Sequence, residues 1–336
     1  MKFATQEPLH TGSCPLISAL TNSIRRRLLK IDRIEVSVSK RGFHCPSLSL
    51  QSHIERVGAC FLDGHHAALR VHSIDQLGVE LSQLPPLYRG FGFEGAGMGL
   101  GLTDSLAIFS SRRWSDFLEG PGQWHKYVLH VGLGWMAARL PWCRSKLDQM
   151  IAKLDPLLGW LVVDGFGFHE GYFHCRRQFD PAAARPPLSP YGIRAFDQGL
   201  GRSLWFVEGT DVHRISARIA AFRPERRADM WSGVGLAMAY AGSADLDQFA
   251  EIPSAAGEHL LHLAQGVTFA AEARELGGIP AAHTERACQL VCGMTASEAA
   301  QLTYSCLPST SNGASDFERW RTNIREELQG RGVSRQ

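Results

Sequence analysis

Glycine recurs inside apolar segments of this chain, at places where no turn is expected. The clearest segments are 94–102 (EGAGMGLGL), 131–135 (VGLGW) and 232–237 (SGVGLA). A glycine inside a helix costs about 1 kcal/mol relative to alanine. This cost is tolerated where the missing side chain lets another helix or a flat ligand approach closely. We therefore expect these segments to form tightly packed, Gly-rich central helices, in two sets that face each other.

The same glycines resemble a phosphate-binding loop only superficially. A dinucleotide-binding loop needs the G-x-G-x-x-G spacing directly after a β-strand. No strand pattern precedes this segment, and no GK[ST] motif follows it. A nucleotide site is therefore not expected at the glycines that occupy every second position, Gly95, Gly97, Gly99 and Gly101.

Helical patterns account for most of the rest, so the predicted fold class is mainly α. Residues 211–222 begin with Asp211, a typical N-cap residue, and place their apolar residues on one face. Residues 316–329 form a charged amphipathic helix, and 185–190 (RPPLSP) form a loop. A further apolar stripe at helical spacing, which Pro156 is expected to kink or restart, consists of Leu147, Ile151, Leu154 and Leu158.

Two expectations concern the first fifty residues. Residues 20–31 read as a helix whose basic cluster forms a solvated face, and 34–38 (IEVSV) alternate as a short strand would. The basic cluster consists of Arg25, Arg26, Arg27 and Lys30.

A weak internal repeat relates the two parts of the chain. Residues 61–64 match 196–199 at an offset of 135, and Gly95 matches Gly233 at an offset of 138. His130 matches His262 at 132, and His169 matches His283 more loosely at 114. We predict one integrated domain built from two tandem, pseudo-symmetric helical halves. Its parts are a lead-in at 1–50, halves at 51–185 and 186–310, and a C-terminal helix and tail at 311–336.

The composition narrows the class of protein. With 336 residues, 44% of them hydrophobic and 20% charged, the chain can bury a large core. These fractions exclude a disordered, collagen-like or fibrous protein. Lys+Arg 35 nearly balances Asp+Glu 33, which argues against a nucleic-acid partner.

Neither a membrane span nor a disulfide framework is expected. The apolar stretch 157–163 is far shorter than the ~20 residues of a membrane helix, and no secretory signal pattern is visible. We expect a cytoplasmic protein. The eight cysteines contain no CxxC pair and predict free thiols. The helical spacing of Cys288 and Cys292 leaves a metal or redox role open.

Four long motifs resemble a known group of sequences. They are 93–102 (FEGAGMGLGL), 154–173 (LDPLLGWLVVDGFGFHEGYF), 195–209 (AFDQGLGRSLWFVEG) and 227–237 (RADMWSGVGLA). Together they resemble an uncharacterised bacterial family of unknown function that is encoded beside enediyne polyketide synthases and in related biosynthetic clusters. The resemblance covers about residues 23–321. It implies secondary metabolism, a polyene or enediyne-type intermediate and contact with a polyketide synthase, and it supplies no catalytic residue.

Acid–base chemistry is the main hypothesis for a site. His169 and Glu170 lie among aromatic residues and glycines, and desolvation is expected to lower the pKa of His169 and raise that of Glu170 unless the two pair. Further catalytic candidates are Glu94, His130, Asp197 and Arg202. Candidates for an aromatic, substrate-binding wall are Trp135, Phe168, Tyr172, Trp205 and Trp231. The structural alternative is a core histidine at His130 and a local ion pair between Asp197 and Arg202.

A metal is a second hypothesis. Histidines and carboxylates from several helices can hold one or two irons, and a single histidine can hold haem, although no cofactor is the leading expectation. The candidate metal ligands are His169, His262, His283 and Glu285. The HExxxH spacing at 169–174 places its histidines on different faces of a regular helix, so a zinc site is not expected there.

Two functions from different classes remain open. The first is an enzyme that processes a hydrophobic polyketide or polyene in a cavity between the halves, by oxidative or acid–base chemistry. The second is a non-catalytic binding or chaperone-like accessory protein. A closed apolar pocket that contains buried His and Glu favours the first, and an exposed apolar patch over a dry core favours the second.

Overall fold

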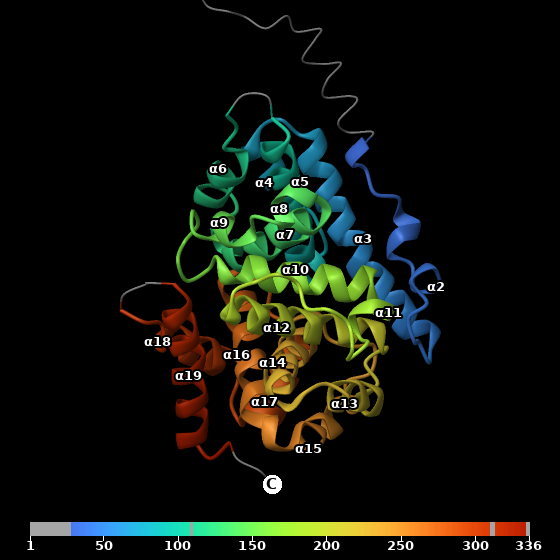
Figure 1. Cartoon of the computed structure of the whole chain (residues 1–336), viewed down its shortest axis with the longest axis vertical. Helices are drawn as coiled ribbons and strands as arrows, with labels where there is room; N and C mark the ends of the chain where they lie inside the picture. Colours follow the sequence, from blue (N-terminus) through green and yellow to red (C-terminus); the bar gives the residue numbers. More distant parts are fainter. Residues whose placement is uncertain (1–27, 108–109, 310–312, 334–336) are drawn as a thin grey trace, which may run out of the picture.

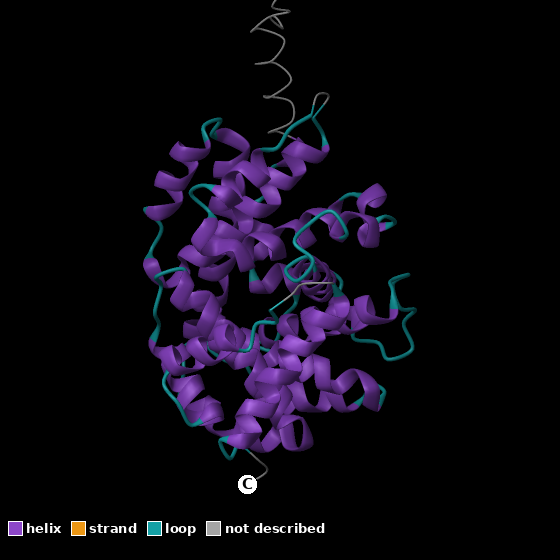
Figure 2. Cartoon of the chain, turned by 90° about the vertical axis from the view of Figure 1, so that its left-hand side faces the viewer, coloured by secondary structure: helices purple, strands orange, loops and turns teal. Residues whose placement is uncertain are grey.

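The computed structural model describes residues 28–107, 110–309 and 313–333, and within these ranges it contains helices and loops but no strand (Figure 2). The prediction of a mainly α-helical fold is therefore confirmed. No helix in the described ranges combines the length and apolar character needed to cross a membrane.

Seven long helices form the centre of the molecule. Each packs on the next one along the chain, and in Figure 1 α5, α7, α10, α12 and α14 follow one another down the picture, with α3 beside the upper helices and α16 beside α14. The stack consists of α3 (Leu48–Arg70), α5 (Pro86–Ser105), α7 (Lys126–Arg139), α10 (Trp160–Phe173), α12 (Pro190–Val207), α14 (Pro224–Ala241) and α16 (Leu260–Leu276).

The remaining helices, most of them shorter, surround this stack. At its lower end α17 (Ala282–Cys292), α18 (Ala296–Ser305) and α19 (Ala314–Gly330) pack on α16. The others are η1 (Arg33–Val36), α2 (Val38–Arg41), α4 (Ile74–Ser82), α6 (Arg113–Glu119), η2 (Gln123–His125), α8 (Pro141–Arg144), α9 (Leu147–Ile151), α11 (Cys175–Gln178), α13 (Val212–Ala220), η3 (Asp247–Glu251), α15 (Ile252–Ala256) and η4 (Gly257–His259).

Glycines set the spacing between consecutive helices of the stack. A β-carbon at Gly165 of α10 would overlap the carbonyl oxygen of Val131 on α7, and one at Gly134 of α7 would overlap that of Val162 on α10. The same reciprocal contact occurs at every step from α3 to α16. Because a side chain at these positions would meet backbone, the helices can approach this closely only with glycine there.

These contacts recur at a short interval. In each helix from α5 to α16, one glycine contacts the backbone of the preceding helix of the stack. These glycines are spaced 33 to 37 residues apart, at Gly95, Gly132, Gly165, Gly199, Gly233 and Gly266. The offset of 138 between Gly95 and Gly233 therefore spans four helix steps. In contrast, Phe61 and Phe196 are not equivalent in the structure. The carbonyl oxygen of Phe61 faces Gly95 on the next helix of the stack, whereas that of Phe196 faces Gly167 on the preceding helix. The division into two superposable halves stays a prediction.

Several local predictions are confirmed. Asp211 caps α13, accepting hydrogen bonds from the amides of His213 and Arg214. α19 spans the predicted C-terminal helix, and 185–189 form a loop before α12. The stripe around Pro156 is interrupted, because α9 ends at Ile151 and α10 begins only at Trp160.

The predicted strand at 34–38 is wrong. Its residues form η1 and the start of α2, because Ser37 caps α2 by accepting from the Lys40 amide. The alternation of apolar residues there reflects burial of Val36 and Val38. Most of the predicted helix 20–31, including Arg25, Arg26 and Arg27, lies outside the described residues.

Candidate functional site

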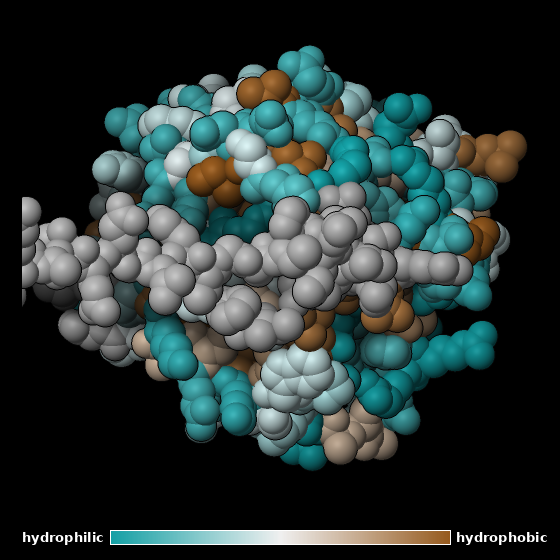
Figure 3. All heavy atoms as spheres, turned by 90° about the horizontal axis from the view of Figure 1, so that it is seen from above, coloured by the Kyte–Doolittle hydropathy of each residue, from teal (hydrophilic) through white to brown (hydrophobic). Residues whose placement is uncertain are grey.

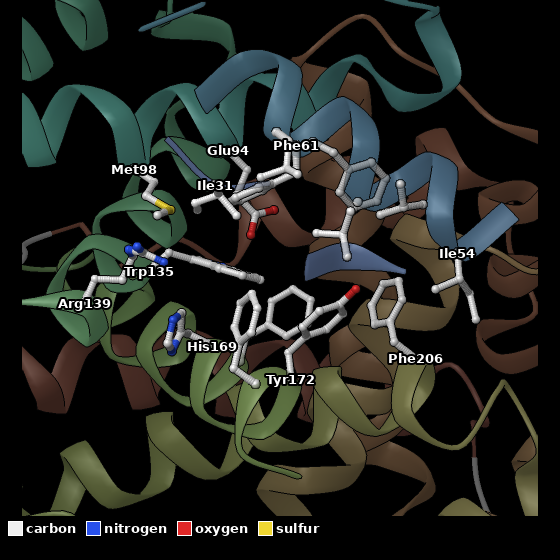
Figure 4. Close-up of a pocket in the computed structure, with 17 residues that line it drawn as sticks. Ile31, Ile54, Phe61, Glu94, Met98, Trp135, Arg139, His169, Tyr172 and Phe206 are labelled. Carbon is white, nitrogen blue, oxygen red and sulfur yellow. The ribbon is translucent and has the colours of Figure 1, made fainter. Parts of the chain in front are cut away.

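A small cavity lies among α3, α5, α7, α10 and α12, beneath the segment that carries Ile31 and Val36 (Figure 4). Its free volume is about 30 Å³. Most of its wall is aliphatic or aromatic, and three charged or titratable side chains that reach it are Glu94, Arg139 and His169. Figure 4 shows the Glu94 carboxyl pointing into this space, with Trp135, His169 and Tyr172 around it.

The glycine repeat explains why a carboxyl reaches the interior. Glu94 directly precedes Gly95, the repeat glycine of α5, and the residue before the repeat glycine is buried in every helix of the stack from α5 to α16. In five of these six helices it is polar, and Val131 of α7 is the exception. We call these five buried side chains the polar row: Glu94, Asp164, Gln198, Ser232 and Gln265.

Most members of the polar row are joined by hydrogen bonds. Gln198 donates to Asp164 over 2.9 Å, and Ser232 lies within hydrogen-bond distance of both Gln198 (3.2 Å) and Gln265 (3.0 Å). Arg321 of α19 closes the far end by donating to Gln265 over 3.1 Å. Hydrogen bonds within the row and from Arg321 therefore engage most of its polar groups, but Gln265 Nε2 and both carboxyl oxygens of Glu94 have no partner.

Glu94 is the unsatisfied end of the row. Neither oxygen of its carboxyl has a hydrogen-bond partner, although the side chain is about 1% exposed. Burial raises the pKa of Glu94 to about 7, and the charge of Asp164 adds to the rise. Arg202, whose Nη2 lies 4.0 Å from Glu94 Oε2, and the Trp135 indole oppose it. A carboxyl with a pKa near neutrality can both give and take a proton.

Arg202 forms its closest ion pair with Asp164 rather than with Glu94. Its guanidinium donates to Asp164 and lies over the Phe168 ring, 4.6 Å from the centroid. Burial would lower the pKa of Arg202, but the attraction of Asp164 and Glu94 outweighs this and raises it. Arg202 thus stays charged, and most of its charge is balanced before Glu94 is considered.

The predicted ion pair between Asp197 and Arg202 is wrong. Residues five apart on a helix point about 140° away from each other, so the two side chains leave α12 in different directions. Asp197 instead accepts two hydrogen bonds from Arg226 of α14, one of them at 2.8 Å. Burial raises the pKa of Asp197, and Arg226 opposes the rise. Asp197 does not line the cavity.

Three of the five predicted aromatic residues line the cavity. Trp135 is central, since its ring centroid lies 5.1 Å from that of Phe168 and 6.0 Å from that of Tyr172. Trp205 and Trp231 are buried elsewhere, and the Trp205 indole donates to the carbonyl of Gly242 over 2.8 Å. The aromatic wall also contains residues that the prediction missed, namely Phe61, Phe91, Phe173 and Phe206.

His169 and Glu170 lie in two different environments. His169 lines the cavity beside Trp135, and burial lowers its pKa. Glu170 is buried outside the cavity, where its Oε2 accepts from Arg177 over 2.7 Å and from Gln178 over 3.0 Å. Burial would raise the pKa of Glu170, but the attraction of His169, Arg144 and His174 outweighs it, so the pKa falls. A raised pKa was expected for Glu170 only if it stayed unpaired, and its ion pairs meet the stated exception.

The HExxxH segment forms a compact cluster after all. α10 ends at Phe173, and His174 leaves the helix with φ −125° and ψ 33°. This turn brings His174 Nε2 to 3.9 Å from Glu170 Oε1, while His169 Nδ1 lies 3.5 Å from the same oxygen. One nitrogen or oxygen from each of the three residues lies within 4.8 Å of the others. The argument from helix faces failed because it assumed an unbroken helix.

The other predicted ligands do not join this cluster. His130 Nδ1 donates to the carbonyl of Lys126 over 2.7 Å, and burial lowers its pKa to about 4, as suits a core histidine. His262 lies on α16, and burial with nearby arginines lowers its pKa to about 3. His283 Nε2 lies 3.1 Å from the carbonyl oxygen of Tyr240, and Glu285 accepts from the Ala296 amide. A shared iron site from these helices is therefore not formed.

A second apolar cavity, of about 40 Å³, lies on the other side of the Arg202–Asp164 pair. Tyr127 and Glu272 are polar residues at its wall, and the Tyr127 hydroxyl donates to Glu272 over 3.1 Å. No sequence pattern had drawn attention to it.

Comparison with known proteins places the chain in one family. A family model described as "Protein of unknown function (DUF1702)" matches residues 20–328. The chain belongs to this family of proteins of unknown function. No curated protein and no solved structure shows significant similarity to it.

Proposed function

We propose that this protein is an enzyme that carries out acid–base chemistry on an apolar, unsaturated small molecule, with Glu94 as the proton donor and acceptor. One observation carries the proposal: a fully buried carboxyl without hydrogen-bond partners, with a pKa near 7, faces an aromatic cavity. Unpaired buried carboxyls are costly to keep, and groups tuned in this way cluster at functional sites.

The chemistry follows from the surroundings of Glu94. The protonated carboxyl transfers its proton to an sp² carbon of the substrate, and the electron pair of that double bond forms the new C–H bond. The faces of Trp135 and Phe168 stabilise the resulting carbocation. Arg202, 4.0 Å away, stabilises the Glu94 carboxylate. A neighbouring C–H then returns its proton to Glu94, so the double bond shifts or a ring closes without any oxidant.

The cavity must open for such a substrate, because about 30 Å³ holds no more than a small group. Ile31 and Val36 form the part of its wall that comes from outside the stack. Two histidines of α3 hold this covering segment: His65 Nε2 lies 3.0 Å from the carbonyl of Leu29, and His66 Nε2 lies 3.0 Å from that of Ile31. Displacement of this short segment would admit a chain-like molecule.

The surface favours an enzyme over a chaperone-like protein. On the face seen in Figure 3, hydrophobic residues lie singly or in small groups among polar ones. The large exposed hydrophobic residues stand on separate elements, for example Leu48 on α3, Val79 on α4 and Tyr304 on α18. Scattered residues of this kind are ordinary on a globular protein.

The resemblance described above supplies the substrate class. A linear conjugated polyene made by a polyketide synthase suits both the apolar wall and a proton-transfer reaction. We accordingly propose a place in enediyne-type or related polyketide biosynthesis, a cytoplasmic location and transient contact with the synthase.

Deuterium transfer tests the proposal. The purified protein is incubated in D2O with the linear polyene released by an iterative polyketide synthase, and the products are analysed by mass spectrometry and ultraviolet absorption. We expect a product with deuterium bonded to carbon, and we expect Glu94→Gln to bind the polyene without forming it. Glu272→Gln, at the second cavity, is the matched control and should behave as wild type.

Two other outcomes would reject the enzyme. Binding of the polyene with no deuterium incorporation by the wild-type protein would point to a holding or accessory role. Equal incorporation by wild type and Glu94→Gln would show that the proton comes from elsewhere.

A further inference from the structure

Three ligand-type atoms meet at the C-terminal end of α10. They are His169 Nδ1, Glu170 Oε1 and His174 Nε2. The first two belong to side chains that are 7% and 1% exposed, and neither atom has a hydrogen-bond partner. Two buried, unsatisfied polar atoms that converge with a third call for an explanation, because buried polar groups in folded proteins are nearly always satisfied.

We propose that His169, Glu170 and His174 bind a divalent first-row transition metal ion. Two imidazoles and one carboxylate are a donor set that selects Fe²⁺ or Zn²⁺ over Mg²⁺ and Ca²⁺, which prefer oxygen ligands. Three protein ligands leave further coordination positions open, as in catalytic rather than structural sites.

The distances fit such an ion only after His174 moves toward the other two ligands, because the three atoms as a set lie within 4.8 Å of one another. Ligands about 2.1 Å from a tetrahedral metal lie about 3.4 Å apart. The His169–Glu170 separation of 3.5 Å already matches, and the His174–Glu170 separation of 3.9 Å is slightly long. His174 is the ligand that can move, since it lies outside the helix and its side chain is 47% exposed.

The surroundings orient the carboxylate toward this position. Arg177, Gln178 and Arg144 all contact Oε2 of Glu170, which leaves Oε1 free for the ion. Partners of this kind fix ligating carboxylates in metal sites. The two guanidinium groups also repel a cation, so we expect moderate affinity.

The proposed metal site lies between solvent and the aromatic cavity. His174 reaches solvent, whereas His169 belongs to the wall of the aromatic cavity. An ion held between them would enter from solvent and lie next to the cavity. Metal binding as such does not depend on the proton transfer proposed for Glu94.

Cobalt(II) titration tests the site. The full chain is freed of metal with a chelator and titrated with Co²⁺, whose visible absorption reports tetrahedral or five-coordinate binding. We expect one ion per chain, displaced by Zn²⁺ and by anaerobic Fe²⁺ but not by Mg²⁺ or Ca²⁺. His174→Ala should weaken binding by at least about 100-fold, since loss of outer-shell groups alone costs 10- to 100-fold.

A matched control exists on the surface. His213 lies 3.1 Å from Glu251, and its side chain is 83% exposed. His213→Ala should leave Co²⁺ binding unchanged, and Glu94→Gln should bind Co²⁺ as wild type does. His169→Asn provides a second variant if His174→Ala melts early.

Each contrary result overturns the site. Absence of Co²⁺ binding by the wild type, wild-type binding by His174→Ala and His169→Asn, or equal losses in His174→Ala and His213→Ala would do so. Metal binding without deuterium transfer would leave this site standing and reject only the enzyme proposal.

Discussion

Glu94 and Glu170 are equally buried, with side chains about 1% exposed, yet their pKa values move in opposite directions. Glu170 lies at the end of α10, where arginines extend to it from solvent-exposed positions. Glu94 lies in the middle of α5, where the nearest cation, Arg202, already forms an ion pair with Asp164. The comparison teaches that access to counter-charges, together with the depth of burial, decides whether a carboxyl in this protein stays ionised.

The largest loss of folding stability should come from replacing Asp164. Asp164→Asn leaves Arg202, a buried cation, without its partner, which costs about 3–5 kcal/mol in the free energy of unfolding. Arg202 then becomes available to Glu94, whose pKa should fall toward the behaviour of Glu170. Urea denaturation across a pH series measures both effects.

The matched control for this change is Asp197→Asn. Asp197 on α12 forms a comparable buried pair with Arg226 on α14, away from the cavity. It should reduce stability without altering the titration of Glu94. If Asp164→Asn leaves that titration unchanged too, the explanation offered for the raised pKa is wrong.

The next largest effect is a dependence of folding stability on pH that arises from the titration of Glu94. Because its folded pKa of about 7 exceeds the usual 4.5, the folded state binds more protons between these values, and stability falls as the pH rises through this window. The groups that act on it are Asp164, Arg202, Trp135 and Tyr240. The full difference amounts to about 3 kcal/mol.

Glu94→Gln should remove this loss. Relative to wild type, the variant should gain stability steadily between pH 4.5 and pH 7 in thermal or urea denaturation. Parallel pH curves for the two proteins would mean that Glu94 is already ionised at low pH and is not poised for proton transfer.

A smaller effect of pH on folding stability, with the opposite sign, is expected from Glu170. Its lowered folded pKa contributes stability that is present above about pH 4.5, the usual value for Glu, and is lost as the pH falls through the folded pKa. Glu170→Gln should cost about 1–2 kcal/mol at pH 7, because Arg144 and Arg177 are 40% and 61% exposed and regain water. A gain of stability at pH 7 would show that the cluster is electrostatically unfavourable.

The sequence indicated the helices and five of the seventeen residues that line the cavity, for physical reasons that can be traced. Glycines inside apolar segments predicted close helix packing, and the aromatic segment 164–173 predicted Phe168, His169 and Tyr172 near one site. Glu94 and Trp135 were named as well. All five residues line one cavity.

Asp164 was missed because the repeat was sought at too long a period. The segments EGAG (94–97), VGLG (131–134), DGFG (164–167), QGLG (198–201), SGVG (232–235) and QGVT (265–268) align at 33 to 37 residues. This alignment would have placed Asp164 beside Glu94 in the polar row. The cluster with His174 could not be foreseen, because it depends on where α10 ends rather than on the spacing of residues along a helix.

The smallest expected effect concerns Trp135, which lies beside His169 and acts on Glu94. Its ring lies 5.5 Å from that of His169, and its indole favours the ionised form of Glu94. Trp135→Phe keeps an aromatic ring in the wall but removes the N–H, so the pKa of Glu94 should rise by a few tenths, and the stability cost should be about 1 kcal/mol. The midpoint of the Glu94-dependent pH transition in thermal denaturation measures the shift, while the acid-side transition of Glu170 should not move. A shift of the Glu170 transition instead would mean that the two carboxyls are coupled through this wall, and the contrast between them would have to be explained by one network rather than by separate partners.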